Sequence, residues 1–299
     1  MSDFTTTYRT DANATLEEPR TEGLADVGKP TLPGSADAPE VTRPTTRSRR
    51  IAIANQKGGV GKTTTAVNLS AALARQGRRT LLIDVDPQAN ASSGVGFSKG
   101  TPGPSSYDLL TGADLDEVIR ATEIPNLDLI ASSPALAGAE VELVDAPGRE
   151  SILRTQLEKA SQRYEYVFID CPPSLGLLTL NALVAADSVL IPLQCEYYAL
   201  EGLSHLLDTL ARVQQGLNPK LEVEGVLLTM FDSRLNLSTQ VAEEARRHFG
   251  QRVYETMIPR NVRLGEAPSF GQPITEYDPH CVGATSYIHL AKEIVSNVR

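Results

Sequence analysis

Tryptophan is absent from this chain and cysteine is scarce: its 299 residues include no Trp and three Cys. Cys171, Cys195 and Cys281 lie far apart and form no C-x-x-C pair. The sequence therefore predicts neither a disulfide framework nor a zinc or iron–sulfur site held within one chain. The four His residues show no ligand spacing either. We expect the thiols to be buried or without a chemical role.

Long apolar runs are also missing. No uninterrupted apolar stretch approaches the roughly 20 residues that a membrane-spanning helix needs, and the first residues lack the basic and apolar blocks of a signal peptide. The net charge of −9 argues against a surface that binds polyanions as a whole, so contact with DNA requires a local basic patch. We expect a cytoplasmic protein without membrane contact.

The first part of the chain differs in composition from the rest. Residues 1–47 are rich in Thr, Pro, Asp, Glu and Ala and show neither a helical nor a strand period. This composition predicts a disordered N-terminal tail over 1–47, followed by one domain over 48–299. The basic residues 47–50 (RSRR) allow two interpretations, a solvated linker or a contact with a phosphate backbone.

From residue 51 onward, short β-branched runs alternate with helical patterns. This alternation predicts an α/β fold, a doubly wound three-layer sandwich with a mostly parallel central sheet, in which ligands bind at the carboxyl ends of the strands. Strands are expected over 51–54, 80–84, 127–132, 166–170, 188–193, 223–230 and 253–258. Helices are expected over 62–76, 149–163, 175–186, 200–216, 238–249 and 284–297.

A glycine-rich loop, residues 57–64 (KGGVGKTT), follows the first expected strand and opens a helix. The ordinary phosphate-loop pattern has Gly where this chain has Gln56, and this chain adds Lys57. Glycines let the backbone approach phosphates, and the helix N-terminus adds partial positive charge. We expect Lys62 at the β- and γ-phosphates, the Thr63 hydroxyl on Mg²⁺ and Thr64 near the α-phosphate. The predicted nucleotide contacts of the loop are Lys57, Gly58, Gly59, Val60, Gly61, Lys62, Thr63 and Thr64.

Two further strand ends carry carboxylates. Asp170 is interpreted as the Walker B carboxylate, which reaches Mg²⁺ through water. The next residues, 171–176 (CPPSLG), are interpreted as a segment that responds to the γ-phosphate, or alternatively as a rigid turn. Asp84 and Asp86 end a strand that we expect beside the phosphate-loop strand. Asp86 is the candidate for orienting or activating the attacking water, and for indirect contact with the metal, while Asp84 organises the loop.

Together these segments resemble the deviant Walker A ATPases, most closely the ParA/Soj chromosome-partitioning branch. The resemblance runs from about Arg50 to the C-terminus and leaves the tail outside. Its motifs are residues 55–64 (NQKGGVGKTT), 84–90 (DVDPQAN), 170–176 (DCPPSLG), 194–203 (QCEYYALEGL) and 258–264 (IPRNVRL).

The resemblance implies ATP and Mg²⁺ as cofactors and hydrolysis of ATP to ADP and phosphate. It implies that Lys57 reaches across a nucleotide-sandwich homodimer to the partner's phosphates, as an arginine finger does, and that Gly58 permits the close approach. Pro259 and Asn261 match the segment that holds the adenine. The catalytic residues would be Lys57, Lys62 and Asp86.

The resemblance also implies that the ATP-bound dimer binds nucleoid DNA without sequence preference, through phosphate contacts. Arg234 and Arg263 fall at the matching positions, with Arg260, Arg246 and Arg247 as neighbours. A ParB-like centromere-binding protein would stimulate hydrolysis and release the dimer from double-stranded DNA. The N-terminal tail is a candidate for contact with a scaffold.

Two other functions remain open at this stage. A positioning ATPase for a flagellar, chemosensory or microcompartment cargo would share every chemical residue. A metabolic P-loop enzyme that activates an amide or carboxylate with ATP would need its own substrate pocket. A MinD-like membrane helix at the C-terminus is not expected, because the apolar positions after residue 284 fit a helix packed on the core.

Overall fold

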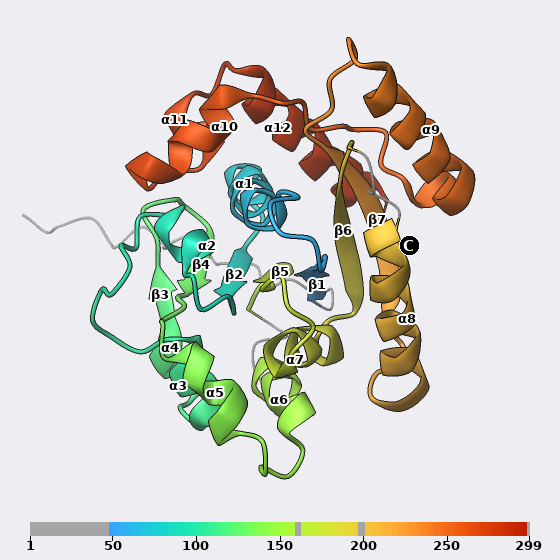
Figure 1. Cartoon of the computed structure of the whole chain (residues 1–299). Helices are drawn as coiled ribbons and strands as arrows, with labels where there is room; N and C mark the ends of the chain where they lie inside the picture. Colours follow the sequence, from blue (N-terminus) through green and yellow to red (C-terminus); the bar gives the residue numbers. More distant parts are fainter. Residues whose placement is uncertain (1–47, 159–162, 197–200, 298–299) are drawn as a thin grey trace, which may run out of the picture. The chain divides into compact units, whose positions relative to one another are not determined.

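The computed structural model describes residues 48–158, 163–196 and 201–297. Its centre is a seven-stranded sheet in the order β3-β4-β2-β5-β1-β6-β7 (Figure 1). Every neighbouring pair is parallel except β3 and β4. The strands are β1 (Arg49–Ile53), β2 (Thr80–Asp84), β3 (Ile119–Ala121), β4 (Leu127–Ile130), β5 (Tyr166–Asp170), β6 (Ser188–Gln194) and β7 (Glu222–Thr229). The predicted fold class is confirmed.

Helices cover both faces of this sheet. The longer ones coincide with the predicted helices to within a few residues, and most of the short ones were not predicted. The α-helices are α1 (Lys62–Arg75), α2 (Asn90–Ser93), α3 (Ser106–Thr111), α4 (Leu115–Val118), α5 (Leu136–Glu142), α6 (Ile152–Glu158), α7 (Leu177–Ala185), α8 (Glu201–Gly216), α9 (Asn236–Phe249), α10 (Val262–Glu266), α11 (Ile274–Tyr277) and α12 (Val282–Ser296). The 3₁₀ turns are η1 (Arg149–Ser151), η2 (Gly250–Arg252) and η3 (Ala267–Phe270).

Alternation along β1 separates two hydrophobic cores. Ile51 and Ile53 pack in the core that contains α1 and α12, whereas Ala52 belongs to the core that contains α7 and α8. Figure 1 shows α1 and α12 on one side of the sheet and α6 and α7 on the other. Since both faces are covered, the central strands are apolar on both sides, as buried parallel strands are. The result is the predicted three-layer arrangement.

The predicted strand over 253–258 is wrong. This segment forms only isolated bridges with the end of the sheet, Val226 with Val253 and Phe231 with Pro259. Two of its backbone N–H groups, at Glu255 and Thr256, donate to the Glu293 carboxylate on α12 at 2.8 and 3.0 Å. Those groups are unavailable to a strand ladder, so the segment does not add a continuous strand to β7.

The last helix packs on the core, as predicted. In α12, Tyr287, Leu290, Ala291 and Ile294 are at most 1% exposed and lie in the same core as α1. Among the helices of the described residues, none is long and apolar enough to cross a membrane. The predicted tail over 1–47 lies outside the described residues, and so does the end of the predicted helix over 149–163.

Candidate nucleotide-binding site

The predicted phosphate loop joins the end of β1 to the start of α1. Gly59 and Gly61 have φ values of 74° and 89°, in the left-handed region that glycine tolerates without a Cβ clash. Gly61 is the N-cap of α1 and supplies no side-chain cap, so the first N–H groups of the helix remain available to an anion. Backbone donors therefore surround the place where phosphates were predicted.

Side chains from neighbouring strands fix this loop. The Thr229 hydroxyl at the end of β7 donates to the Val60 carbonyl at 2.9 Å. The Asn55 amide donates to the Pro192 carbonyl in β6 at 2.8 Å, and its oxygen accepts from the Lys57 N–H at 3.0 Å. The sequence interpretation gave Asn55 and Thr229 no role. Asn55 lies in a quoted motif, which was a usable signal, whereas only the sheet order brings Thr229 to the loop.

Lys62 lies inside the loop. Its side chain is largely buried, and its Nζ donates to the Lys57 carbonyl at 3.2 Å. Burial lowers the pKa of Lys62, while the negative charges of Asp170 and Asp86 act in the opposite direction. An ammonium in such a place gains from a phosphate, which would supply the compensating charge that burial removes. The Lys57 backbone belongs to the loop as well, and its side chain is partly exposed.

Asp170 lies at the carboxyl end of β5, opposite Ile53 in β1 and Asp84 in β2. The side chain is completely buried, and neither carboxylate oxygen has a hydrogen-bond partner of normal geometry. Its pKa is raised well above the usual range, first by burial and then by the charge of Asp84, although the nearby Thr63 hydroxyl lowers it. A buried carboxylate without a partner fits a cation at this position.

Asp84 and Asp86 hold the turn after β2. The buried Asp84 carboxylate accepts from the N–H and hydroxyl of Ser92 at 2.8 and 2.7 Å and from the Asp86 N–H at 3.1 Å. Asp86 accepts from the Gln88 N–H at 2.9 Å, and its carbonyl accepts from the Ser132 hydroxyl at 2.6 Å. Two of these supporting residues were missed: Ser92, because no sequence pattern marks its bond to Asp84 across the turn, and Ser132, because its partner lies 46 positions away.

The predicted neighbourhood of β2 is wrong in one respect. β2 does not lie beside β1, because β5 is inserted between them. The crossover through α1 therefore skips one strand position. Asp86 still acts electrostatically on Lys62 across this distance, so the change of strand order does not remove Asp86 from the site.

The buried carboxyl group of Asp84 should make the free energy of unfolding depend on pH. Burial raises its pKa to about 6 despite the hydrogen bonds from Ser92. A carboxyl group whose pKa is higher in the folded state than in the unfolded state stabilises the fold while it is protonated, and that contribution is lost as the pH rises through the folded pKa. Relative to Asp84→Asn, which does not titrate there, the wild type should lose about 2 kcal/mol of unfolding free energy between about pH 4 and 7. Urea denaturation at several pH values measures this difference, and a constant difference would contradict it.

The segment predicted to hold the base lies beside the loop that follows β7. The Phe231 N–H donates to the Ile258 carbonyl at 3.0 Å and the Arg260 N–H to the Phe231 carbonyl at 3.1 Å, so the two loops run side by side. Pro259 bridges to Phe231. Asn261 is the N-cap of α10, where its oxygen accepts from the Arg263 N–H at 2.8 Å. The NH₂ group of Asn261 takes no part in this cap.

Three of the predicted DNA-contacting arginines carry an acidic partner on the same surface. Arg234 contacts Asp232 through Nε at 2.9 Å and Nη2 at 2.7 Å, and this pairing lowers the pKa of Asp232 to about 2. Arg260 pairs with Glu196 at 2.9 Å, and Arg263 pairs with Glu266 at 2.8 Å and with Asp278 at 3.5 Å. The charge of Arg260 also acts on Asp232, which places the loops of Arg234 and Arg260 together.

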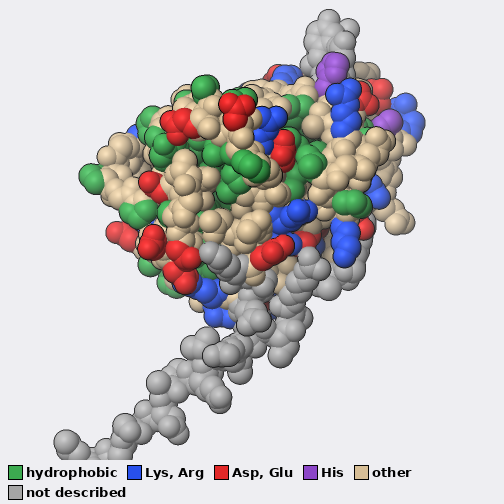
Figure 2. Space-filling model, turned by 90° about the horizontal axis from the view of Figure 1, so that it is seen from below, with side chains coloured by type: hydrophobic (Ala, Val, Ile, Leu, Met, Phe, Trp, Pro, Cys, Tyr) green, Lys and Arg blue, Asp and Glu red, His purple; other side chains and the backbone are tan. Residues whose placement is uncertain are grey.

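Arg246 and Arg247 lie elsewhere, in the last turn of α9, where Arg246 contacts the Met257 sulfur at 3.9 Å. Figure 2 shows Lys and Arg side chains interspersed with Asp and Glu on one face of the molecule. Across the described atoms of that view, no broad area is basic throughout. On this face, positive charge is therefore local. Part of the predicted motif over 194–203, namely 197–200, lies outside the described residues.

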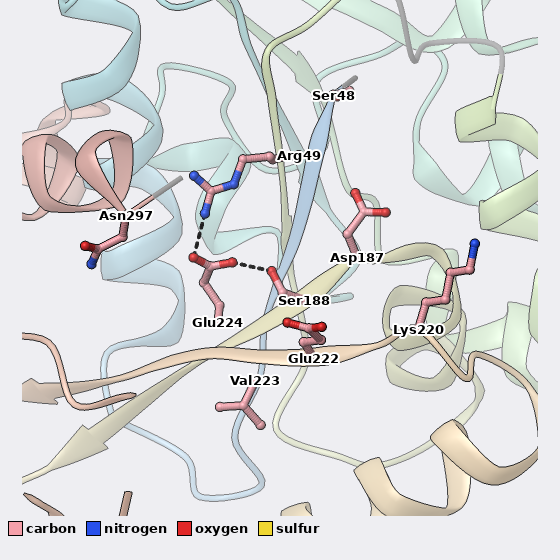
Figure 3. A pocket seen from close by; sticks show the side chains of 9 residues that line it. All are labelled: Ser48, Arg49, Asp187, Ser188, Lys220, Glu222, Val223, Glu224 and Asn297. Atoms are coloured by element: carbon pink, nitrogen blue, oxygen red, sulfur yellow. Dashed lines mark hydrogen bonds and ion pairs between the residues drawn. The ribbon is translucent and has the colours of Figure 1, made fainter. Parts of the chain in front are cut away.

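A cavity of about 360 Å³ lies at the amino ends of β1, β6 and β7, away from the phosphate loop (Figure 3). Within it the Glu224 carboxylate accepts from Arg49 at 2.7 Å and from the Ser188 hydroxyl at 2.5 Å. Beside it, Arg50 pairs with Asp187 at 3.3 Å. Arg49 and Arg50 thus begin β1 in ion pairs, so the interpretation of this basic stretch as a solvated linker is wrong for these two residues.

Comparison with known proteins places this geometry in a family. A family model described as an AAA domain matches residues 48–223. The sporulation initiation inhibitor protein Soj of Bacillus subtilis is 58% identical over 83% of this chain and 98% of its own length. The chromosome partitioning protein ParA of Myxococcus xanthus is 56% identical over 84% of this chain and 89% of its own length. Among solved structures, cobyrinic acid a,c-diamide synthase from Mycobacterium smegmatis with bound ADP and magnesium has a TM-score of 0.72 and 37% identity, covering 82% of this chain and 93% of that one.

Proposed function

This chain belongs to the ParA/Soj family of chromosome-partitioning ATPases and is an ATP hydrolase with ATP and Mg²⁺ as cofactors, and we propose that it segregates chromosomes by ATP-dependent binding to the nucleoid. One observation carries the proposal. The phosphate loop with Lys62 and the unpartnered carboxylate of Asp170 lie together at the carboxyl ends of the neighbouring strands β1 and β5. The M. smegmatis structure with ADP and magnesium supports the choice of cofactors.

The residues of this site divide the work of hydrolysis. Backbone N–H groups of the loop and Lys62 would bind the phosphates, and Thr63 and Asp170 would hold Mg²⁺, Thr63 through its hydroxyl and Asp170 through water. When bound, Mg²⁺ neutralises charge on the β- and γ-phosphates. Asp86 orients the attacking water and accepts its proton. Among the described residues, no three His, Cys, Asp or Glu side chains cluster as a metal site, which is compatible with an Mg²⁺ ion that would keep water and nucleotide oxygens as ligands.

A second copy of the chain completes the site in this proposal. Lys62 already occupies the inside of its own loop, where it contacts the Lys57 carbonyl. The Lys57 side chain, five positions earlier, then serves the nucleotide of the partner, as an arginine finger does. ATP, which presents a γ-phosphate, favours this dimer over the ADP state. The resulting cycle is ATP binding, dimerisation, DNA binding, and release after hydrolysis stimulated by a ParB-like protein.

The proposed DNA surface is built from Arg234, Arg260 and Arg263, and Arg246 and Arg247 in the last turn of α9 are proposed as additional contacts. Because each of the first three has an acidic partner, one protomer offers little net positive charge, and dimerisation doubles it. Such a surface suits weak contacts with phosphates that salt disrupts. The N-terminal tail over 1–47, taken as separate from the ATPase domain over 48–299, is proposed to contact a scaffold.

Binding to a fluorescent duplex of arbitrary sequence, with ATP or ADP and over a salt series, tests the proposal. We expect binding with ATP alone, and a loss of about 10-fold or more in affinity for Arg234→Glu. Arg212→Glu, a charge reversal on α8 outside the predicted set, is the matched control and should bind like the wild type. Equal binding in both nucleotide states, or none in either, would contradict nucleotide-gated DNA binding.

An ATP-dependent amide-forming enzyme is the second candidate, because the M. smegmatis protein carries such a name. The identities of 58% and 56% to Soj and ParA, against 37% to the synthase, favour chromosome partitioning. The two candidates differ in what raises ATP turnover: DNA with a ParB-like protein for the first, and a small carboxylic acid with an amide nitrogen donor for the second. A positioning ATPase for another cargo would respond to DNA equally, and identification of the bound cargo separates it.

A further inference from the structure

The helix that follows the proposed γ-phosphate segment lacks a cap of its own. α7 begins at Leu177, directly after residues 171–176, and its N-cap is Gly176. Glycine has no side chain that can accept the first N–H groups, and the first turn contains no acidic residue. Such a helix start leaves backbone donors unsatisfied unless another element supplies an acceptor.

Glu140 on α5 supplies that acceptor. Its Oε1 accepts from the Leu178 N–H at 3.4 Å. A Cβ placed on Gly176 would lie 2.1 Å from the same oxygen and 3.0 Å from Cδ, so the carboxylate fills the volume that a capping side chain would occupy. A negative charge at a helix N-terminus is also favourable electrostatically. Glu140, which lies 38 positions before Leu178 in the chain, thus caps α7.

The rest of α7 is anchored without Glu140. The Asn181 amide donates to the Arg149 carbonyl at 2.7 Å, and its oxygen accepts from the Leu153 N–H at 3.2 Å. At the other end, the Asn218 amide donates to the Ala186 carbonyl at 2.8 Å. These contacts fix the middle and the end of the helix. The contribution of Glu140 is therefore confined to the helix start.

The start of α7 is connected to residues 171–176. The Thr179 hydroxyl in the first turn donates to the Ser174 carbonyl at 2.6 Å. Ser174 lies in the short segment that leads back to Asp170, the proposed metal-binding carboxylate at the end of β5. A displacement of the first turn of α7 therefore displaces residues 171–176, and with them the surroundings of Asp170.

We propose that Glu140 is a positioning residue for ATP hydrolysis, which caps α7 from α5 and thereby fixes residues 171–176 beside the reacting phosphates. The inference rests on the proposed ATPase function and adds α5 to the parts of the molecule that set its rate. An absence of ATP hydrolysis by the wild type would refute the proposed function itself. If the wild type hydrolyses ATP but Glu140→Ala hydrolyses it equally fast, only the role of Glu140 is refuted.

Steady-state ATP hydrolysis by the full-length protein with Mg²⁺ and DNA tests it. Glu140→Ala should lower kcat about 5- to 10-fold with KM for ATP unchanged, because nucleotide contacts remain and the loop is misplaced. Glu142→Ala removes a carboxylate from the same helix, which accepts from the Tyr107 hydroxyl at 2.8 Å, and should leave kcat within about 2-fold. An unchanged kcat in Glu140→Ala would overturn the proposal.

A second substitution separates capping from any other role of Glu140. Gly176 has φ −82° and ψ −167°, an extended conformation typical of N-cap serine, so Gly176→Ser is compatible with the backbone. In the wild-type background this change should leave kcat within about 2-fold of wild type, because the flexible Glu140 side chain can move away from the new Cβ while the Ser hydroxyl supplies a cap. In Glu140→Ala it should restore kcat to within about 2-fold of wild type by supplying a local cap. Failure to restore kcat in a folded double variant would overturn the capping role.

Discussion

Replacing Asp86 with alanine is expected to reduce ATP hydrolysis by at least about 10²-fold while ATP binding persists, because positioned general bases contribute about 10²- to 10⁴-fold. Asp86 is 6% exposed and is held by the Gln88 N–H, so it is positioned before nucleotide binds. Its charge acts on Lys62 inside the phosphate loop. Single-turnover hydrolysis and equilibrium binding of a fluorescent ATP analogue measure the two effects separately.

The same variant should accumulate in the ATP state and bind DNA for longer than the wild type, since hydrolysis is the proposed release step. Glu222→Ala, which removes an exposed carboxylate at the far end of the sheet, is the control for loss of charge. Hydrolysis by Asp86→Ala at the wild-type rate would remove Asp86 from the mechanism. If Asp86→Ala loses ATP binding as well as hydrolysis, Asp86 supports the phosphate loop and does not act on the attacking water.

Replacing Lys57 with alanine is expected to reduce hydrolysis by about 10²- to 10³-fold, somewhat less than the loss that follows removal of an arginine finger. Lys62 already occupies the loop interior, where it contacts the Lys57 carbonyl, and this supports the proposal that the Lys57 side chain acts on the partner's nucleotide. The variant should bind ATP in the monomer, fail to dimerise and therefore fail to bind DNA. Light scattering after size exclusion, with ATP and with ADP, measures dimer formation.

Lys62→Ala is the comparison for this result. Lys62 is proposed to act on the nucleotide of its own chain, so its loss should weaken ATP binding itself, whereas loss of Lys57 should not. A Lys57→Ala protein with normal hydrolysis and normal affinity for DNA would contradict the role of Lys57 across the dimer. Equal loss of ATP binding in both variants would place the two lysines on the same nucleotide.

Local sequence predicted the parts of this site that depend on one segment. The glycine-rich loop, the strand ending in Asp170 and the helix from Lys62 each combine apolar period and residue type within a short stretch, and all three are found. The strands over 80–84 and 166–170 are confirmed to the residue. The roles of the site residues remain predictions, since the structure gives positions and not chemistry.

The errors concern contacts between distant segments. The segment over 253–258 has the composition of a strand, but Glu293, on a helix that follows much later, takes two of its N–H groups. The position of β2 depends on the insertion of β5, which no local pattern encodes. The support of Asp84 by Ser92, of the loop by Thr229 and of α7 by Glu140 likewise appears only when the chain is folded.

Mixing the two inactive variants tests most directly the claim that two copies of this chain share their active sites. In a mixed dimer of Lys57→Ala and Asp86→Ala, one site combines an intact Asp86 with the intact Lys57 of the other chain, and the other site lacks both. Equal mixing should therefore restore hydrolysis far above that of either variant alone, because each mixed dimer has one working site. Random pairing of subunits would give about a quarter of the wild-type rate. Activity no higher than that of either variant alone, in mixtures shown to exchange subunits, would contradict the account.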